Sequence, residues 1–260
     1  MNFGTLHEGG VLTKNTQKIF TLLGESFETL AQANSFSQQH LLRTGERWDQ
    51  QEETPVFQKC IQHKDALMNH LKVLGMVDAV YPAKKQFHYA LCMGALAGRV
   101  QQRLDFIADL QDDGYTFDTI VLLGGARPLR ESEKLMVLES IETEAHMMQY
   151  LYDNHARIEK TKLMCVDVPM IQKDDGSTRR PNTDDTLNFF SEMASGDGDC
   201  LVVSNNPYLL RQAKVTQRIL DQERFPTYGA GTALDDKKVD ILIAMDELAR
   251  AIYEEYRASK

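Results

Sequence analysis

The stretch Thr119-Ile120-Val121-Leu122-Leu123-Gly124-Gly125 shows the pattern that decides the fold of this chain. Its continuous apolar run predicts a buried strand, and the paired glycines after it predict a tight turn. Similar apolar runs occupy residues 89–93, 163–166 and 201–204, and clusters rich in polar residues and glycine follow them. Helical patterns come after nearly every cluster, so the alternation predicts an open parallel α/β sheet.

We therefore expect an α/β fold with a Rossmann-like, mostly parallel sheet of about five strands flanked by helices. Residues 239–244 supply the fifth strand candidate, and residues 99–110, 131–152 and 184–193 predict helices of the core. Residues 1–85 carry helical stripes, and we expect them to form an N-terminal helical extension or lid. The Rossmann-like core then spans residues 86–260.

Composition limits the class of protein. The chain has 260 residues, 42% of them hydrophobic, and its formal net charge of -9 disfavours nucleic acid as a partner. Its 4 cysteines form no CxxC pair, which is typical of a reduced protein. Residues 1–5 lack secretory-signal features, and no apolar run approaches the length of a membrane span. We expect a cytoplasmic protein without membrane contact, and the oligomeric state stays open.

Common catalytic motifs are absent from the sequence. It contains no Walker A sequence, no GxSxG elbow and no GxGxxG before a helix. This disfavours P-loop, serine-hydrolase and ordinary dehydrogenase chemistry. The histidines are scattered and match no HExxH pattern, so we expect no metal site built on histidine. The candidate function therefore depends on polar groups at the predicted strand ends.

The turn at Gly124 and Gly125 has two interpretations. It either needs glycine only because it is tight, or it exposes backbone N–H groups to an anion. Arg127 and Arg130 favour the second interpretation, because the turn does not need them and arginine grips phosphate or carboxylate.

Three more arginines follow predicted strands. Arg99 lies near the end of the first strand and can reach a ligand there. Arg103, one turn further, is expected at the surface or in packing. Arg211 lies one turn inside the helix expected after Asn206-Pro207, and it is the best candidate for anion recognition in that segment.

The acidic residues after these turns also have two interpretations. Ser132 and Glu133 suit a helix N-terminus, but Glu133 facing the ligand would bind a ribose hydroxyl, a cation or a catalytic water. The run Asn182-Thr183-Asp184-Asp185 suits a helix cap, and we favour that interpretation. Its paired carboxylates can also hold a divalent ion or act as acid and base.

The order of these clusters resembles that of the bacterial YdcF/SanA/ElyC-like family (domain of unknown function 218) over residues of about 86–220. The similar segments are residues 91–103, 120–133, 182–188 and 201–211. The resemblance implies a Rossmann-like fold without a settled reaction. Carried over residue by residue, it implies site roles for Gly94, Arg99, Gly124, Gly125, Ser132, Glu133, Asn182, Thr183, Asp185 and Arg211.

We expect a small-molecule enzyme, a transferase or hydrolase, that binds a nucleotide-like or phosphorylated ligand at the strand ends. Arg99, Arg127 and Arg211 would neutralise the anion, and Glu133 and Asp185 would be catalytic. Mg²⁺ and S-adenosylmethionine are candidate cofactors. The alternative is a non-catalytic ligand-sensing or protein-interaction module at the same place. Carboxylates that converge with the arginines favour catalysis, and carboxylates that only cap helices favour binding alone.

Overall fold

The computed structural model describes residues 4–42, 54–235 and 240–260. The chain divides into two compact units. Unit 1 comprises Met1–Val80, Asn206–Lys214 and Ala233–Lys260, and unit 2 comprises Tyr81–Asn205 and Val215–Thr232. Helix α9 (Leu209–Ile219) has residues in both. The expected domain boundary near residue 85 stays a prediction.

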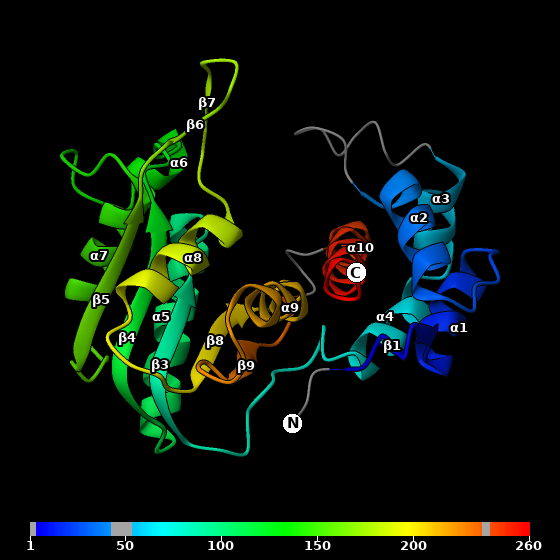
Figure 1. Cartoon of the computed structure of the whole chain (residues 1–260), viewed down its shortest axis with the longest axis horizontal. Helices are drawn as coiled ribbons and strands as arrows, with labels where there is room; N and C mark the ends of the chain where they lie inside the picture. The colour runs from blue at the N-terminus through cyan, green and yellow to red at the C-terminus, as the bar shows by residue number, and fades with distance from the viewer. Residues whose placement is uncertain (1–3, 43–53, 236–239) are drawn as a thin grey trace. The chain divides into compact units, whose positions relative to one another are not determined.

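The core of unit 2 is a parallel sheet, as Figure 1 shows. Its five strands are β3 (Gln86–Met93), β4 (Thr116–Gly125), β5 (Lys162–Val168), β8 (Cys200–Asn205) and β9 (Thr227–Thr232), in the order β5-β4-β3-β8-β9. Every neighbouring pair is parallel, and Leu91 of β3 pairs with Val121 on one side and Val202 on the other. The expected α/β fold with a Rossmann-like parallel sheet is confirmed.

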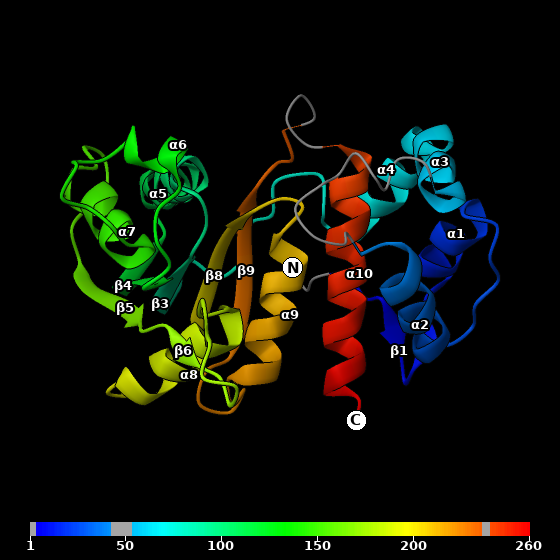
Figure 2. The ribbon, with the colours of Figure 1, turned by 90° about the horizontal axis from the view of Figure 1, so that it is seen from above.

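Helices cover both faces of this sheet (Figure 2). Helix α5 (Ala97–Asp112) packs on β3, β8 and β9, and α7 (Glu144–Asp153) packs on β4 and β5. Helix α8 (Thr183–Met193) packs on β4 and β5 from the opposite face. Because neither face meets water, the central strands are continuous apolar runs rather than alternating ones.

Two short elements of unit 2 lie between the main ones. Helix α6 (Glu131–Lys134) follows β4. Strands β6 (Ile171–Gln172) and β7 (Thr178–Arg179) form an antiparallel hairpin between β5 and α8.

Unit 1 is mostly helical. It contains α1 (Lys14–Leu22), α2 (Leu30–His40), α3 (Pro55–Gln62), α4 (Lys64–Val73) and α10 (Ile241–Ala258), with a small antiparallel pair of strands, β1 (His7–Glu8) and β2 (Val11–Leu12). Helix α10 packs against α2, α3 and α4 and buries Met245, Leu248 and Ile252. No helix within residues 4–42, 54–235 and 240–260 is both long and apolar enough to cross a membrane.

Two sequence predictions are wrong. The strand expected at residues 239–244 is the start of α10, where the Asp240 side chain accepts a hydrogen bond from Leu242 N, and Val239 lies outside the described residues. Strand β9 supplies the fifth strand instead. The helix expected over residues 131–152 is interrupted, because Thr143 caps a new helix, α7, by accepting from His146 N.

Candidate functional site

The strand order defines a switch point in unit 2. From β3 the chain adds β4 and β5 on one side, then returns to add β8 and β9 on the other side. Ligands of open α/β sheets bind beyond the carboxyl ends of the strands at such a reversal. Strands β3 and β8 end at Met93 and Asn205, so these two residues mark the candidate site.

A buried arginine joins the ends of β3 and β8. Arg103 of α5 is only 1% exposed. Its Nη1 donates to the backbone oxygens of Met93, at 2.5 Å, and Gly94, at 3.0 Å, and its Nε donates to Asn205 Oδ1 at 2.8 Å. Of the two places expected for Arg103, the surface is wrong and packing is right, and its guanidinium also holds together the two strand ends of the switch point.

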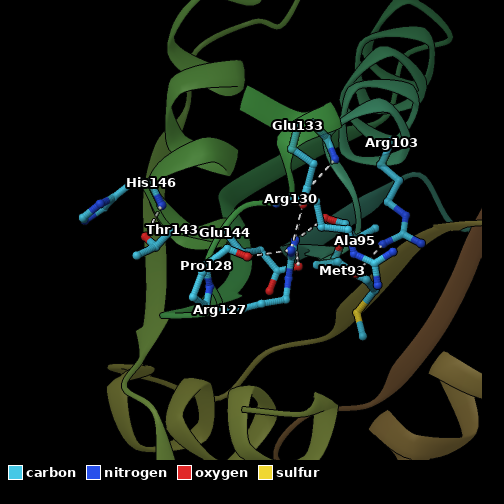
Figure 3. Close-up of polar contacts among 12 residues, drawn as sticks. Met93, Ala95, Arg103, Arg127, Pro128, Arg130, Glu133, Thr143, Glu144 and His146 are labelled. Atoms are coloured by element: carbon cyan, nitrogen blue, oxygen red, sulfur yellow. Dashed lines mark hydrogen bonds and ion pairs between the residues drawn. The ribbon is translucent and has the colours of Figure 1, made fainter. Parts of the chain in front are cut away.

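A second arginine lies between two carboxylates just after β4 (Figure 3). Arg127 binds Glu133 with both Nη atoms, at 2.8 and 3.0 Å, and its Nη2 also donates to Glu144 Oε1 at 3.3 Å. Burial lowers the pKa of Arg127, but the hydrogen bonds and charges of Glu133 and Glu144 raise it above its ordinary value. Arg127 therefore stays charged.

The carboxylate of Glu133 accepts hydrogen bonds from several donors. Besides Arg127, its carboxylate accepts from Ala97 N at the start of α5, at 3.1 Å, and from Arg130 N, at 2.9 Å. Burial raises its pKa, but the hydrogen bonds from Arg127 and Arg130 N outweigh burial and hold the pKa below its ordinary value. Glu133 is therefore an ionised anchor that links the start of α5 to the segment after β4.

Glu144 differs from Glu133 in its environment. It is the first residue of α7, and Arg127 is its hydrogen-bond partner. Burial raises its pKa above the ordinary value, the charge of Arg127 opposes this, and the charge of Glu133 adds to it. Glu144 was not predicted as a site residue, because the expected long helix placed it in a helix interior; the N-cap signal of Thr143 marks its true position.

The glycines at the strand ends are needed for close packing. A Cβ on Gly94 would lie 2.6 Å from Leu123 O, and one on Gly124 would lie 2.8 Å from Ala145 Cα. A Cβ on Gly125 would lie 2.9 Å from Val168 O. None of the three has a positive φ. The nearby protein backbone thus accounts for glycine at these positions, in line with the tight-turn interpretation.

Gly124→Ala is expected to lower the free energy of unfolding by about 2 kcal/mol, since β4 or α7 must shift to admit the methyl group. Urea unfolding of the two proteins measures the difference. Gly98→Ala is the matched control, because a Cβ there meets no atom within 4 Å. Its free energy of unfolding should be unchanged or slightly higher than that of the wild type. Equal effects of the two variants would contradict the packing argument.

The cap at the start of α8 is confirmed. Asn182 Oδ1 accepts from Asp185 N at 3.1 Å, and Asp185 Oδ2 accepts from Asn182 N at 2.7 Å. Thr183 is the first helical residue. Arg179 of β7, which was not predicted as a site residue, binds both oxygens of Asp185, and its hydrogen bonds are the largest cause of the lowered pKa of Asp185. Within the described residues, no hydrogen bond or ion pair joins Asp185 to Glu133.

The remaining predicted site residues lie in several places. Arg99 is half-buried in the first turn of α5, and Ser132 and Arg130 are exposed in and before α6. Arg211 belongs to unit 1, where its Nε donates to Glu247 Oε2 of α10 at 2.6 Å. The structure thus brings Gly94, Arg127 and Glu133 together, and the role of Arg211 in anion recognition stays a prediction.

No protein-family model matches the chain, and no curated protein is significantly similar to it. The fold defines an α/β protein with Rossmann-like parallel-sheet topology. In the part of the chain that the structure describes, no three His, Cys, Asp or Glu side chains are grouped to hold a metal ion.

Proposed function

We propose that unit 2 binds a small anionic ligand, nucleotide-like or phosphorylated, beyond the carboxyl ends of β3 and β8. The observation that carries this proposal is the reversal of strand order between these two strands, at an edge where arginines gather. Arg103 fixes the two strand ends, and Arg127 follows the neighbouring strand. Switch points of this kind hold phosphate-bearing ligands in other open α/β sheets.

The start of α5 supports an anionic ligand. This helix follows β3 directly, and its N-cap residue, Leu96, supplies no side-chain hydrogen bond. Backbone N–H groups at a helix N-terminus attract anions, and Arg99 in the same turn adds a positive charge. The carboxylate of Glu133 already accepts a hydrogen bond from Ala97 N, so an anionic group of the protein itself binds this helix N-terminus.

Catalysis is the second candidate, and Glu144 favours it. Glu133 and Asp185 are engaged by arginines and backbone N–H groups, and their lowered pKa values make them poor general acids. The raised pKa of Glu144 makes it better suited than Glu133 or Asp185 to exchange a proton. Transfer or hydrolysis at a phosphorylated or adenosyl-containing ligand is the chemistry to test.

We also propose that the chain is a divergent relative of the YdcF/SanA/ElyC-like family. The parallel sheet supports this, and so does the order of the similar segments, which include the ends of β3, β4 and β8 and the start of α8. A ligand identified for a member of that family would then suggest a ligand for this chain.

A thermal-shift screen of nucleotides, sugar phosphates and S-adenosylmethionine, with and without Mg²⁺, tests the proposal. A ligand at about 100 times its Kd should stabilise the wild type by about 2.7 kcal/mol. Arg99→Ala is expected to weaken the affinity about tenfold, because a charged contact is lost.

The matched control is Arg157→Ala. Its half-exposed side chain pairs with Asp109 and Asp112 near the other end of α5, and its removal should leave the ligand-induced shift unchanged. Absence of a shift with every ligand, or an equal shift in Arg99→Ala and the wild type, would refute binding at this edge.

A further inference from the structure

Two carboxylates share Arg127 unequally. Glu133 accepts four hydrogen bonds, from two Arg127 nitrogens and from Ala97 N and Arg130 N. Glu144 accepts one, from Arg127 Nη2. The side chain of Glu133 is 2% exposed and that of Glu144 is 15% exposed. Protonation therefore costs Glu133 several charge-assisted hydrogen bonds and costs Glu144 little.

The surroundings of Glu144 place it at the proposed ligand edge. Its Oε1 lies 3.2 Å from the position that a Cβ on Gly94 would take, so it lies against the carboxyl end of β3. The charged groups that act on it are Arg127 after β4, Glu133 of α6 and Arg103 of α5. On its own helix, His146 has an exposed side chain that approaches Asp167 rather than Glu144. Figure 3 shows Glu144 and Glu133 on either side of Arg127.

We propose that Glu144 is the proton-exchanging carboxyl of this site, and that it takes up one proton from solvent when an anionic ligand binds beside Arg127. This inference rests on the proposed function. A bound anion competes for the positive charge of Arg127, and the guanidinium cannot give up a proton. Of the two carboxylates that bind Arg127, Glu144 has fewer compensating donors, so it becomes neutral. The neutral carboxyl can then donate a hydrogen bond to an oxygen of the ligand.

Proton uptake gives the binding reaction a defined pH dependence. The pKa of Glu144 is higher in the bound state than in the free state, so affinity is constant at low pH. It falls by up to about tenfold per pH unit between the two pKa values and is constant again above them. A ligand whose own charge does not change over this range isolates the contribution of the protein.

Sulfate is the probe, since it stays a dianion throughout. Its affinity is measured by thermal-shift titration from about pH 5 to about pH 9 with the wild type and Glu144→Gln. The wild-type affinity should fall with pH, and the variant should keep the low-pH affinity of the wild type over the whole range. Glu131→Gln is the matched control, because Glu131 is an exposed residue of α6, and it should follow the wild type.

The possible results separate the role of Glu144 from the binding of the anion itself. A pH-independent wild-type affinity, or a fall that persists in Glu144→Gln, overturns the role of Glu144 and leaves ligand binding intact. Absence of sulfate binding at every pH removes the proposed anion site, and this inference falls with it. If Glu144→Gln does not fold, NMR titration of the Glu144 carboxyl in the wild type, with and without sulfate, decides the matter. A pKa that sulfate does not raise contradicts the proposal.

Discussion

Replacing Arg103 with methionine is expected to lower the free energy of unfolding by about 3 kcal/mol. Methionine keeps most of the volume but donates no hydrogen bond, so Met93 O, Gly94 O and Asn205 Oδ1 lose their buried charged partner. Removing a charged partner from a buried acceptor costs about 1.5 to 3 kcal/mol per bond, and relief of the desolvation of the guanidinium offsets part of the sum.

Urea unfolding followed by circular dichroism measures this effect, and Arg157→Met is its control. Arg157 pairs with Asp109 and Asp112 at the surface, so its replacement should cost no more than about 1 kcal/mol. Hydrogen exchange at Gly94 and Asn205 should also accelerate in Arg103→Met, because the ends of β3 and β8 are no longer joined. Equal stabilities of the two variants would show that Arg103 does not hold the switch point together.

The fold of unit 2 was predictable because its signals are local and repeated. Apolar runs such as residues 119–123 are too short and too continuous for amphipathic surface helices, and glycine directly follows the runs at residues 89–93 and 119–123. The fifth strand was not predictable. Strand β9 contains Gly229 and Gly231, which weaken any strand signal, whereas residues 241–244 form a short apolar run whose periodicity does not separate a strand from a buried helix.

In the candidate site, too, local features were predictable from the sequence and contacts between distant residues were not. The cap of Asn182 and Asp185 was predictable because it joins residues three apart in the chain. The bond from Arg103 to Asn205 joins residues 102 apart, and no local pattern indicates it. The same holds for the contact of Glu144 with Gly94. Whether the glycines and carboxylates serve packing or ligand binding is decided by such distant contacts.

The second large effect is expected for Glu133→Gln, which should lower the free energy of unfolding by about 3 to 5 kcal/mol at neutral pH. The substituted amide presents N–H donors to groups that are themselves donors: Arg127, Ala97 N and Arg130 N. The buried charge of Arg127 then keeps Glu144 as its remaining carboxylate partner. Glu131→Gln, in the same short helix but exposed, should change stability by less than about 0.5 kcal/mol.

Acid pH provides the decisive check on Glu133, because its pKa in the folded protein is below the ordinary value of 4.5. A carboxyl with a lowered folded pKa stabilises the protein fully above its unfolded pKa, and this stabilisation is lost as pH falls through the folded pKa. The stability difference between the wild type and Glu133→Gln should therefore be constant from neutral pH down to about pH 5 and shrink below that. Urea unfolding at a series of pH values measures it. A difference that stays constant into strong acid would mean that the loss comes from the shape of the amide and not from the charge of Glu133.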